Sequence, residues 1–521
     1  MTSRDIHPTD LQDVLNDALA EHHSGGYEAA VDRYQMILEH HPERADVWGY
    51  LGVALRGAGD IQGAVKAGQE SVRLAPASAE AWNGLAGSQR RAGDDEAARF
   101  SLRRAIEINP RYAEAWANLA DLARDRGARD EAYQGYCRAA ELTRDIAPFQ
   151  NDVGNRLFDL GAFEAAAACY DAAVNAAPSM VQAWNNLGNT RRCLHDFGGA
   201  VAAYDRALAI EPGLGPAANG RAQTLLLTGD FERGWPAYET RFSAPGAPPK
   251  PRYSQPEWQG EDIRDQRILV YGEQGLGDTL QFVRFCRPLA ERGAAVILLC
   301  QRRAAALART ACGIDRVVAM GEALPDFDRH IPLMSLPRVL GTGDDTLAHA
   351  VPYLSAPPDR DRPKSTARNR IGLSWSGNPD HVDDKRRSLS LQKLAPLLDR
   401  PDVEFVSLQL DGAAEIERLG LGGRLTDGAA GDRDLADTAA TLMSLDLVIT
   451  VDTAIAHLAG ALARPCWVML PHLPDWRWLL ERDDSPWYPS LTLFRQPRPD
   501  DWHSVVRRVA DALDQQIKEE P

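Results

Sequence analysis

Three short segments in the C-terminal part of the 521-residue chain combine small residues with groups that can do acid–base or anion-binding chemistry. The first is the turn from Gly272 to Thr279, which contains Gly275, Gly277 and Asp278 and follows an apolar run. Glycines let a ligand approach the backbone, and the helix that starts here offers free amides. Asp278 can take a proton from a hydroxyl or can simply cap that helix. The spacing departs from GxGxxG, which disfavours a nicotinamide cofactor.

The second segment carries amide, imidazole and guanidinium groups directly after an apolar run that ends at Trp375. Its candidate binding residues are Ser376, Gly377, Asn378, His381, Asp384, Arg387 and Ser388. Three consecutive cations, Lys385 to Arg387, suit a ligand that carries negative charge. The alternative is a solvated run of charges on the surface.

The third segment follows another apolar run and opens a helix with Asp452, Thr453 and His457. Amides at a helix start can hold a phosphate, Thr453 can add a hydroxyl, and His457 lies one turn further on the same face. Asp452 is either part of this site or the N-cap of the helix. Downstream, Trp476 and Arg477 put an aromatic ring and a cation near the edge of the same site.

These segments need a sheet to bring them together. Apolar, β-rich runs alternate with helical patterns at 267–271, 295–300, 315–319, 370–375, 403–408, 446–450 and 466–470. Such alternation predicts parallel sheets, with ligands at the carboxyl ends of the strands. The proline-containing stretch 351–363 separates two groups of strands. We therefore expect an α/β region of two Rossmann-like halves that face a cleft.

The N-terminal part of the chain repeats with a period of 34 residues. Tryptophan, proline, glycine and alanine each form a column in register, as in Trp48, Trp82, Trp116 and Trp184. Glycine relieves the turn between two helices, proline ends the second helix, and alanine lets the paired helices approach. The pattern predicts a helix-turn-helix unit repeated about seven times, from about Leu11 to Phe242.

These columns resemble the tetratricopeptide repeat (TPR), whose units stack into an α-solenoid with a concave face for a peptide or protein. Polar residues stand two positions after the tryptophan column, at Asn118, Asp152 and Asn186. In the nucleocytoplasmic O-GlcNAc transferase family, a ladder of asparagines along the groove grips the substrate backbone, and this partial ladder resembles a shorter version. The alternative is that these side chains only fill a solvated inner face.

Proline-rich sequence between Ser243 and Asp262 marks a semi-rigid linker after the repeats. We expect a TPR array at 1–245, a linker at 246–266, a first half of the α/β region at 267–360 and a second half at 361–521. The first half is expected to receive the acceptor, and the second half the donor.

Composition excludes several classes of function. The net charge is −16, from 58 Lys plus Arg and 74 Asp plus Glu, and no basic block offers a surface for nucleic acid. No run of about 18 apolar residues could span a membrane, and the first residues lack the apolar core of a secretory signal, so we expect a cytoplasmic protein. The 7 cysteines form no CxxC pair, which disfavours a disulfide framework or a structural zinc site.

Four motifs in the α/β region carry a second resemblance. LGD at 276–278, WSGNPxHxxDxxRS at 375–388, VDTAxAHLAGAL at 451–462 and PDWRW at 474–478 resemble bacterial GT-B glycosyltransferases related to the ADP-heptose:lipopolysaccharide heptosyltransferases. The likeness covers about residues 267–515. Tetratricopeptide repeats fused to such a transferase resemble the flagellin glycosyltransferases that attach a nonulosonic acid such as pseudaminic acid. The domain order also parallels that of O-GlcNAc transferase.

The resemblance implies roles for the three segments. Asp278 matches the catalytic carboxylate of the family. The implied donor-binding residues are Gly275, Gly277, Thr279, Ser376, Gly377, Asn378, His381, Asp384, Arg387, Ser388, Asp452, Thr453, His457, Trp476 and Arg477. Glycosyl transfer needs a base for the acceptor proton and dipolar or positive groups for the departing phosphate. We assign the base to Asp278, and the stabilisation of the leaving group to Arg387 and the helix at Thr453. Ala454 departs from the glycine typical of heptosyltransferases.

The sequence therefore predicts a metal-independent protein O-glycosyltransferase with no cofactor and a nucleotide-sugar co-substrate, CMP-linked in preference to UDP- or ADP-linked. The TPR groove, through Asn118, Asp152 and Asn186, would recruit the protein acceptor, with flagellin as the expected one. Two DxD pairs, Asp326–Asp328 and Asp432–Asp434, are interpreted as surface residues and not as metal ligands. The alternatives are a non-catalytic TPR scaffold with a degenerate transferase domain, or a transferase that acts on lipopolysaccharide or another glycan.

Overall fold

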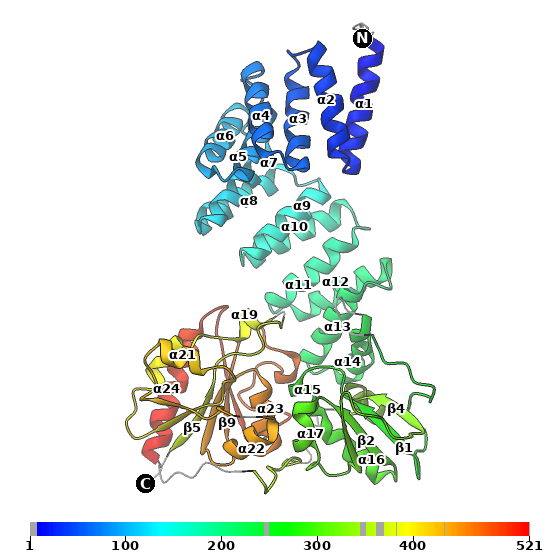
Figure 1. Cartoon of the computed structure of the whole chain (residues 1–521), viewed down its shortest axis with the longest axis vertical. Helices are drawn as coiled ribbons and strands as arrows, with labels where there is room; N and C mark the ends of the chain where they lie inside the picture. The colour runs from blue at the N-terminus through cyan, green and yellow to red at the C-terminus, as the bar shows by residue number, and fades with distance from the viewer. Residues whose placement is uncertain are drawn as a thin grey trace. The chain divides into compact units, whose positions relative to one another are not determined.

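The computed structural model of the chain describes residues 8–243, 249–343, 351–360, 369–381, 383–431 and 433–519. The chain divides into two compact units (Figure 1). The first comprises Met1–Asp196 and Ala209–Glu211, and the second comprises Phe197–Leu208 and Pro212–Pro521. The boundary between the units thus lies inside the repeats.

Helices in antiparallel pairs build the repeats (Figure 1). They are α1 (Pro8–Ser24), α2 (Tyr27–His40), α3 (Ala45–Ala58), α4 (Ile61–Leu74), α5 (Ala79–Arg91), α6 (Asp95–Ile108), α7 (Ala113–Asp125), α8 (Arg129–Leu142), α9 (Ala147–Asp159), α10 (Phe163–Ala176), α11 (Val181–Cys193), α12 (Phe197–Ile210), α13 (Gly215–Leu227) and α14 (Phe231–Tyr238). The predicted α-solenoid is therefore confirmed.

The columns of the repeat act as predicted. The turn glycines adopt a positive φ, from 78° at Gly229 to 91° at Gly59, and His195, which fills the gap in that column, has a φ of 60°. The alanines of the fourth column, such as Ala98, are fully buried between the paired helices. Tryptophan and proline belong together because each indole N–H donates to the carbonyl of the proline six residues earlier, as Trp116 does at 3.0 Å.

The first parallel sheet has the order β3-β2-β1-β4. Its strands are β1 (Arg267–Tyr271), β2 (Ala295–Cys300), β3 (Arg316–Ala319) and β4 (Arg329–Pro332). The helices of this half are α15 (Leu276–Phe282), α16 (Cys286–Glu291), α17 (Arg302–Ala308) and α18 (Leu336–Leu340). Three of these strands follow the predicted runs, and β4 was missed because its four residues include polar Arg329 and His330.

The second parallel sheet has the order β10-β9-β8-β5-β6-β7. Its strands are β5 (Arg370–Ser374), β6 (Glu404–Ser407), β7 (Leu425–Asp427), β8 (Leu447–Val451), β9 (Cys466–Leu470) and β10 (Leu491–Arg495). Its helices are α19 (Asp384–Arg387), α20 (Leu391–Leu394), α21 (Ala413–Arg418), α22 (Leu435–Leu442), α23 (Ala454–Ala461) and α24 (Trp502–Glu519). The strand order reverses between β5 and β8, which is the switch point where doubly wound sheets bind ligands.

One hydrophobic core joins the two sheets and the last pair of repeat helices. Trp235 of α14 is 3% exposed and lies edge-on to Trp476, Trp487 and Phe282, with centroid distances of 5.5, 6.4 and 6.3 Å. Its indole N–H donates to the carbonyl of Thr342 at 2.9 Å. The last repeat therefore belongs to the same folded unit as the sheets.

A buried ion pair reinforces this docking. The 3₁₀ helix η1 (Glu239–Ser243) follows α14 and places Arg241 2.8 Å from Glu273 and 2.8 Å from Ser335. Glu273 follows β1 and also accepts from the amides of Leu333 and Met334, which follow β4. The switch point of the first sheet, between β1 and β4, is thus filled by the chain's own side chains.

The proposed linker lies partly outside the described residues, which leave out Pro245 and Pro248. Further along, Trp258 is fully buried and its amide donates to the carbonyl of His330 at 2.8 Å, so this segment packs on β4. Among the described helices, none has a stretch apolar and long enough to cross a bilayer.

We expect Trp235→Ala to lower the free energy of unfolding of the second unit by about 3–5 kcal/mol, because a fully packed indole leaves a cavity. Urea denaturation followed by tryptophan fluorescence measures this. Phe100→Ala is the control, since Phe100 is 59% exposed and should cost little. Equal stability of the Trp235 variant and the wild type would contradict the assignment of the last repeat to this core.

Candidate functional site

The turn after β5 is organised by a glutamine from the neighbouring strand connection. Gln409 follows β6, and its side-chain oxygen accepts from the amides of Trp375 and Ser376 at 3.1 and 3.0 Å. The next amide, that of Gly377, donates to the Ser388 hydroxyl at 2.9 Å. The amides at this end of β5 are therefore held by side chains from two other segments.

The cationic run folds back onto Gly377. Ser388 donates to Asp384 at 2.7 Å, and Arg387 lies 3.5 Å from the same carboxylate. The guanidinium packs closely over Gly377, since a Cβ built there would lie 2.6 Å from Nη2 of Arg387. The Arg387 side chain is 17% exposed, whereas that of Arg386 is 53% exposed. The structure thus singles out Arg387 from the charge run and turns it inward.

Thr453, and not Asp452, caps the helix that follows β8. The Thr453 hydroxyl accepts from the amide of Ile455 at 3.3 Å. Asp452 is 7% exposed, and burial raises its pKa to about 6. Asp475 adds to the rise, while Arg387 and Arg477 oppose it. The alternative that Asp452 is merely the N-cap is therefore wrong, and this carboxyl instead lies within a cluster of charges beside the switch point.

His457 is a buried ring that joins the two halves. Its Nδ1 lies 3.0 Å from the Tyr488 hydroxyl, and the ring stacks on Trp478 with 5.4 Å between centroids. Burial, followed by Arg477 and Arg284, lowers the pKa of His457 well below its usual value. A Cβ on Gly277 would lie 3.0 Å from this ring, so glycine in the first segment permits α15 and α23 to touch.

Asp278 is held by both halves of the α/β region. One oxygen accepts from the amide of Gly275 at 2.7 Å and caps α15, and the other pairs with Arg477. Arg477 also contacts Asp475 at 2.8 Å and Gln281 at 2.7 Å, and its guanidinium lies 4.2 Å from the centre of the Trp476 ring. Although burial opposes it, Asp475 and Asp278 raise the pKa of Arg477. This guanidinium therefore stays charged.

Several predicted residues do not join this cluster. The buried Thr279 hydroxyl donates to Gln301 at 2.7 Å. Asn378 and His381 accept from the amides of Asp380 and Asp383, both at 3.1 Å, and so stabilise their own exposed turn. Asp278, Arg387, Asp452, His457, Trp476 and Arg477 are the predicted side chains that the structure brings into the cluster.

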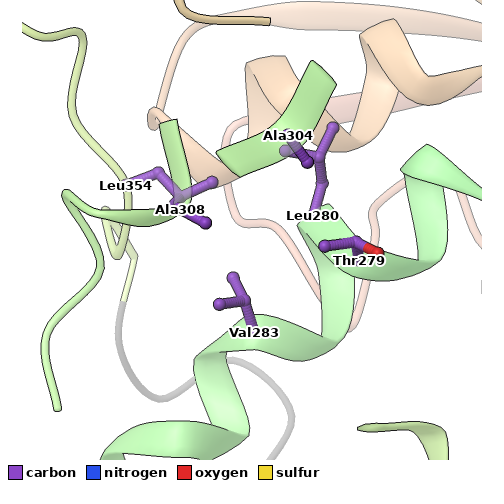
Figure 2. A pocket seen from close by; sticks show the side chains of 6 residues that line it. All are labelled: Thr279, Leu280, Val283, Ala304, Ala308 and Leu354. Carbon is purple, nitrogen blue, oxygen red and sulfur yellow. The ribbon is translucent and has the colours of Figure 1, made fainter. Parts of the chain in front are cut away.

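A hollow beside Thr279 is not a donor site. Figure 2 shows that Thr279, Leu280, Val283, Ala304, Ala308 and Leu354 line it. It has no room for a water-sized molecule and its lining is almost wholly apolar, so it cannot hold a nucleotide-sugar.

Several residues that build the cluster were not predicted from the sequence. Gln409 follows a strand, so the rule that led to the other segments could have found it. Asp475 and Gln281 hold Arg477; Asp475 lies inside the PDWRW motif, and Gln281 lies three residues after the LGD motif. Arg284 donates to the Trp487 carbonyl and the Tyr353 hydroxyl, both at 2.9 Å. No sequence pattern indicated these last contacts, which join segments far apart in the chain.

The predicted groove residues form hydrogen-bonded pairs in the repeats. Asn118 donates to Asn83 at 2.8 Å, and Asn186 donates to Asn151 and Asn155, both at 3.0 Å. Asp152 pairs with Arg156. Asparagines from successive repeats thus make a ladder of contacts with each other.

The first DxD pair lies opposite one arginine side chain. Asp326 and Asp328 face Arg267 at 3.9 and 3.0 Å. Asp432 of the other pair lies outside the described residues. Among the side chains that are described, no group of three His, Cys, Asp or Glu is arranged to hold a metal ion.

Comparisons with known proteins identify the repeats. Models of the tetratricopeptide repeat match residues 18–79, 79–112 and 152–214, which confirms the repeat predicted from the 34-residue period. Protein FlbA of Caulobacter vibrioides is 31% identical over 312 residues, or 54% of this chain and 52% of FlbA. The chain thus spans about half the length of this curated relative.

Two solved structures are similar to part of the chain. One is a thermophilic TPR protein of Thermus thermophilus, which is 21% identical. The match covers 34% of this chain and 98% of the Thermus chain, with a TM-score of 0.31. The other is the pilF protein of Pseudomonas aeruginosa, which is 16% identical. The match covers 41% of this chain and 96% of the pilF chain, with a TM-score of 0.33.

Asp452→Asn tests the buried carboxyl. The folded pKa of about 6 exceeds the ordinary 3.8, so its contribution to stability is present below about pH 4 and is lost as pH rises through about 6. The amide does not titrate. We therefore expect the variant to gain about 3 kcal/mol relative to wild type between about pH 4 and pH 7.5, by urea unfolding. Asp326→Asn, at an exposed position, should follow the wild type. A pH-independent difference for Asp452→Asn would contradict the buried acid.

Proposed function

We propose that the chain is a metal-independent GT-B protein O-glycosyltransferase that moves a sugar from a nucleotide-sugar to Ser or Thr of a protein acceptor. One observation carries this proposal: a carboxylate from the first half, Asp278, meets Arg477 from the second half beside the charged switch point. Transfer between two bound substrates needs groups from both sides of a cleft, and this pair supplies them.

The donor side of the proposal rests on charge at the switch point between β5 and β8. The start of α23 directs its dipole there, and the partly buried Arg387 packs over Gly377 beside Asp384. A departing nucleotide diphosphate or monophosphate would gain from both. CMP-, UDP- and ADP-linked sugars share this phosphate chemistry, and the CMP-linked donor remains our first candidate.

The acceptor side of the proposal rests on Asp278. In the transfer step, the carboxylate takes the proton of the acceptor hydroxyl, the oxygen bonds to the anomeric carbon, and the bond to the nucleotide phosphate breaks. The bonds from the Gly275 amide and Arg477 fix the direction of the carboxylate. Gln281 and Asp475 in turn fix Arg477 and so act as positioning residues.

The repeats favour a protein over a glycan as acceptor, because TPR grooves bind extended segments of protein. Flagellin modified with a nonulosonic acid such as pseudaminic acid, in the cytoplasm, is the specific case that the sequence resemblance implies. The groove ladder of Asn118 and Asn186 would contact the acceptor backbone once its internal pairs open.

A scaffold without catalysis is the second candidate, and one observation favours it. The amides after β5 are taken by Gln409 and Ser388, and Asp278 is taken by Arg477, so each group has a partner within the chain. In this case the α/β region would serve to hold the repeats.

Nucleotide-sugar binding distinguishes these candidates. We expect Arg387→Gln to weaken donor binding about tenfold, because the inward guanidinium loses its charge-assisted bond to phosphate. Arg386→Gln is the matched control, since this neighbour points to solvent and should bind like the wild type. Isothermal calorimetry with CMP-, UDP- and ADP-linked sugars, with and without EDTA, gives both values. Binding that requires a divalent metal would contradict the mechanism, and no binding by any donor would favour the scaffold.

Asp278→Asn tests the base. The amide keeps nearly all of the packing and can still accept from Gly275, but it cannot take a proton, so we expect the rate of transfer to fall at least about 100-fold. Intact-mass analysis of flagellin coexpressed with each variant measures the modification. Capture of flagellin by the variant serves as the control for folding. Modification at the wild-type rate would place the base elsewhere or remove the activity from this chain.

A further inference from the structure

Tyrosines recur at one position of the second helix in each of the last four repeats. Tyr136, Tyr170, Tyr204 and Tyr238 lie on α8, α10, α12 and α14 and are 34 residues apart. All four are buried, and Tyr238 is exposed by no more than 4%. Because the backbone repeats, their hydroxyl groups occupy equivalent places in successive repeats.

Two earlier members of this column have hydroxyl partners on the first helix of their own repeat. Tyr136 donates to Asp121 at 2.7 Å, and Tyr170 donates to the amide oxygen of Asn155 at 2.8 Å. Arg156 of the next repeat lies 3.2 Å from the same Asp121. A hydroxyl of this column therefore lies where the first helices of two successive repeats meet, and it donates to a carbonyl or carboxylate oxygen there.

Tyr238 occupies the same position in the last repeat, where a different segment takes the place of a following first helix. This segment is the 3₁₀ helix η6 (Trp476–Trp478), which packs against α13. The Tyr238 ring lies edge-on to Trp476 with 5.5 Å between centroids. The guanidinium of Arg477 lies over the same indole. Tyr238 therefore borders the charged cluster of the candidate site.

The Tyr238 hydroxyl forms no hydrogen bond within the part of the chain that the structure describes, and it is not closed off from solvent. Burial raises the pKa of Tyr238, while Arg477 opposes the rise and Asp278 adds to it. The hydroxyl thus keeps its proton and can donate it in a hydrogen bond. Asp278, with 20% of its side chain exposed, lies near enough for its charge to act on this hydroxyl.

The packing of Tyr238 requires only its ring. The ring contacts Trp476, and the guanidinium of Arg241 lies 5.4 Å from its centre. Phenylalanine would keep both contacts and would avoid an unpaired hydroxyl among buried side chains, which costs free energy. A bound substrate can supply the missing partner.

We propose that Tyr238 is an acceptor-binding residue, whose hydroxyl donates to a backbone carbonyl of the acceptor protein and so holds the Ser or Thr to be modified at Asp278. A peptide carbonyl is the same kind of hydrogen-bond acceptor as the amide oxygen that Tyr170 uses. The last repeat thereby supplies part of the active site. This inference rests on the proposed transfer from a nucleotide-sugar to a protein.

Steady-state kinetics of the full-length chain with Tyr238→Phe test this role. We expect kcat/KM for flagellin to fall about tenfold, because the variant loses one hydrogen bond and the orientation that it gives to the acceptor. KM for the nucleotide-sugar should stay at the wild-type value. The melting temperature should stay the same or rise, since an unpaired hydroxyl is removed. The donor is whichever of the CMP-, UDP- and ADP-linked sugars supports transfer by the wild type.

Tyr136→Phe is the matched control from the same column. Loss of the bond to Asp121 should lower its melting temperature, while kcat/KM for flagellin should equal that of the wild type. The two variants remove the same atom from equivalent positions, so a contrast between them separates a role in acceptor binding from a role in repeat stability.

Equal kcat/KM for flagellin in Tyr238→Phe and the wild type would overturn this inference and leave the proposed function intact. A tenfold rise in KM for the nucleotide-sugar would place the hydroxyl on the donor side and would also overturn it. So would an equal loss of kcat/KM in Tyr136→Phe, which would indicate a general effect of the repeats. No transfer by the wild type from any of the three donors would contradict the proposed function itself, and this inference with it.

Discussion

The arrangement of the candidate site depends on one buried cation, the guanidinium of Arg477. Removing such a charge from water is costly unless carboxylates and hydrogen bonds surround it. Asp278, Asp475 and Gln281 do this, and they come from both halves of the α/β region. The same guanidinium lies over Trp476, which packs against Trp235 of the last repeat. The charge at the site and the docking of the final repeat are therefore coupled through neighbouring side chains.

Much of the fold could be predicted because its signals are local and repeated. The turn glycines, the buried alanines and the bond from Trp116 to the carbonyl of Pro110 each depend on residues a few positions apart. Predominantly apolar strands such as β1 and β8 were equally recognisable. The strands β4, β7 and β10 were missed because three to five residues that include polar members carry little pattern, and pairing with neighbouring strands defines them.

The candidate site was less predictable, since a motif gives the chemistry of a residue and not the direction of its side chain. Thr279 and Asp278 are adjacent, yet one hydroxyl turns to Gln301 and the other side chain turns to Arg477. Lys385, Arg386 and Arg387 form one run of positive charges in the sequence, but of the three only Arg387 packs onto Gly377. These directions follow from tertiary packing, which the linear sequence specifies only through residues far away.

Because the helix pairs repeat, residues at equivalent positions of neighbouring repeats can be compared directly. Arg56 and Arg90 have the same backbone setting one repeat apart, so the difference between them lies in the partners that the sequence provides. Asp121 and Asp125 pair with Arg90, whereas Gly87 lies beside Arg56. A helical array needs its glycines, alanines and tryptophans at fixed positions to stack, and the column of Arg56 and Arg90 lies outside them. Differences in that column therefore change which charged side chains pair between neighbouring repeats.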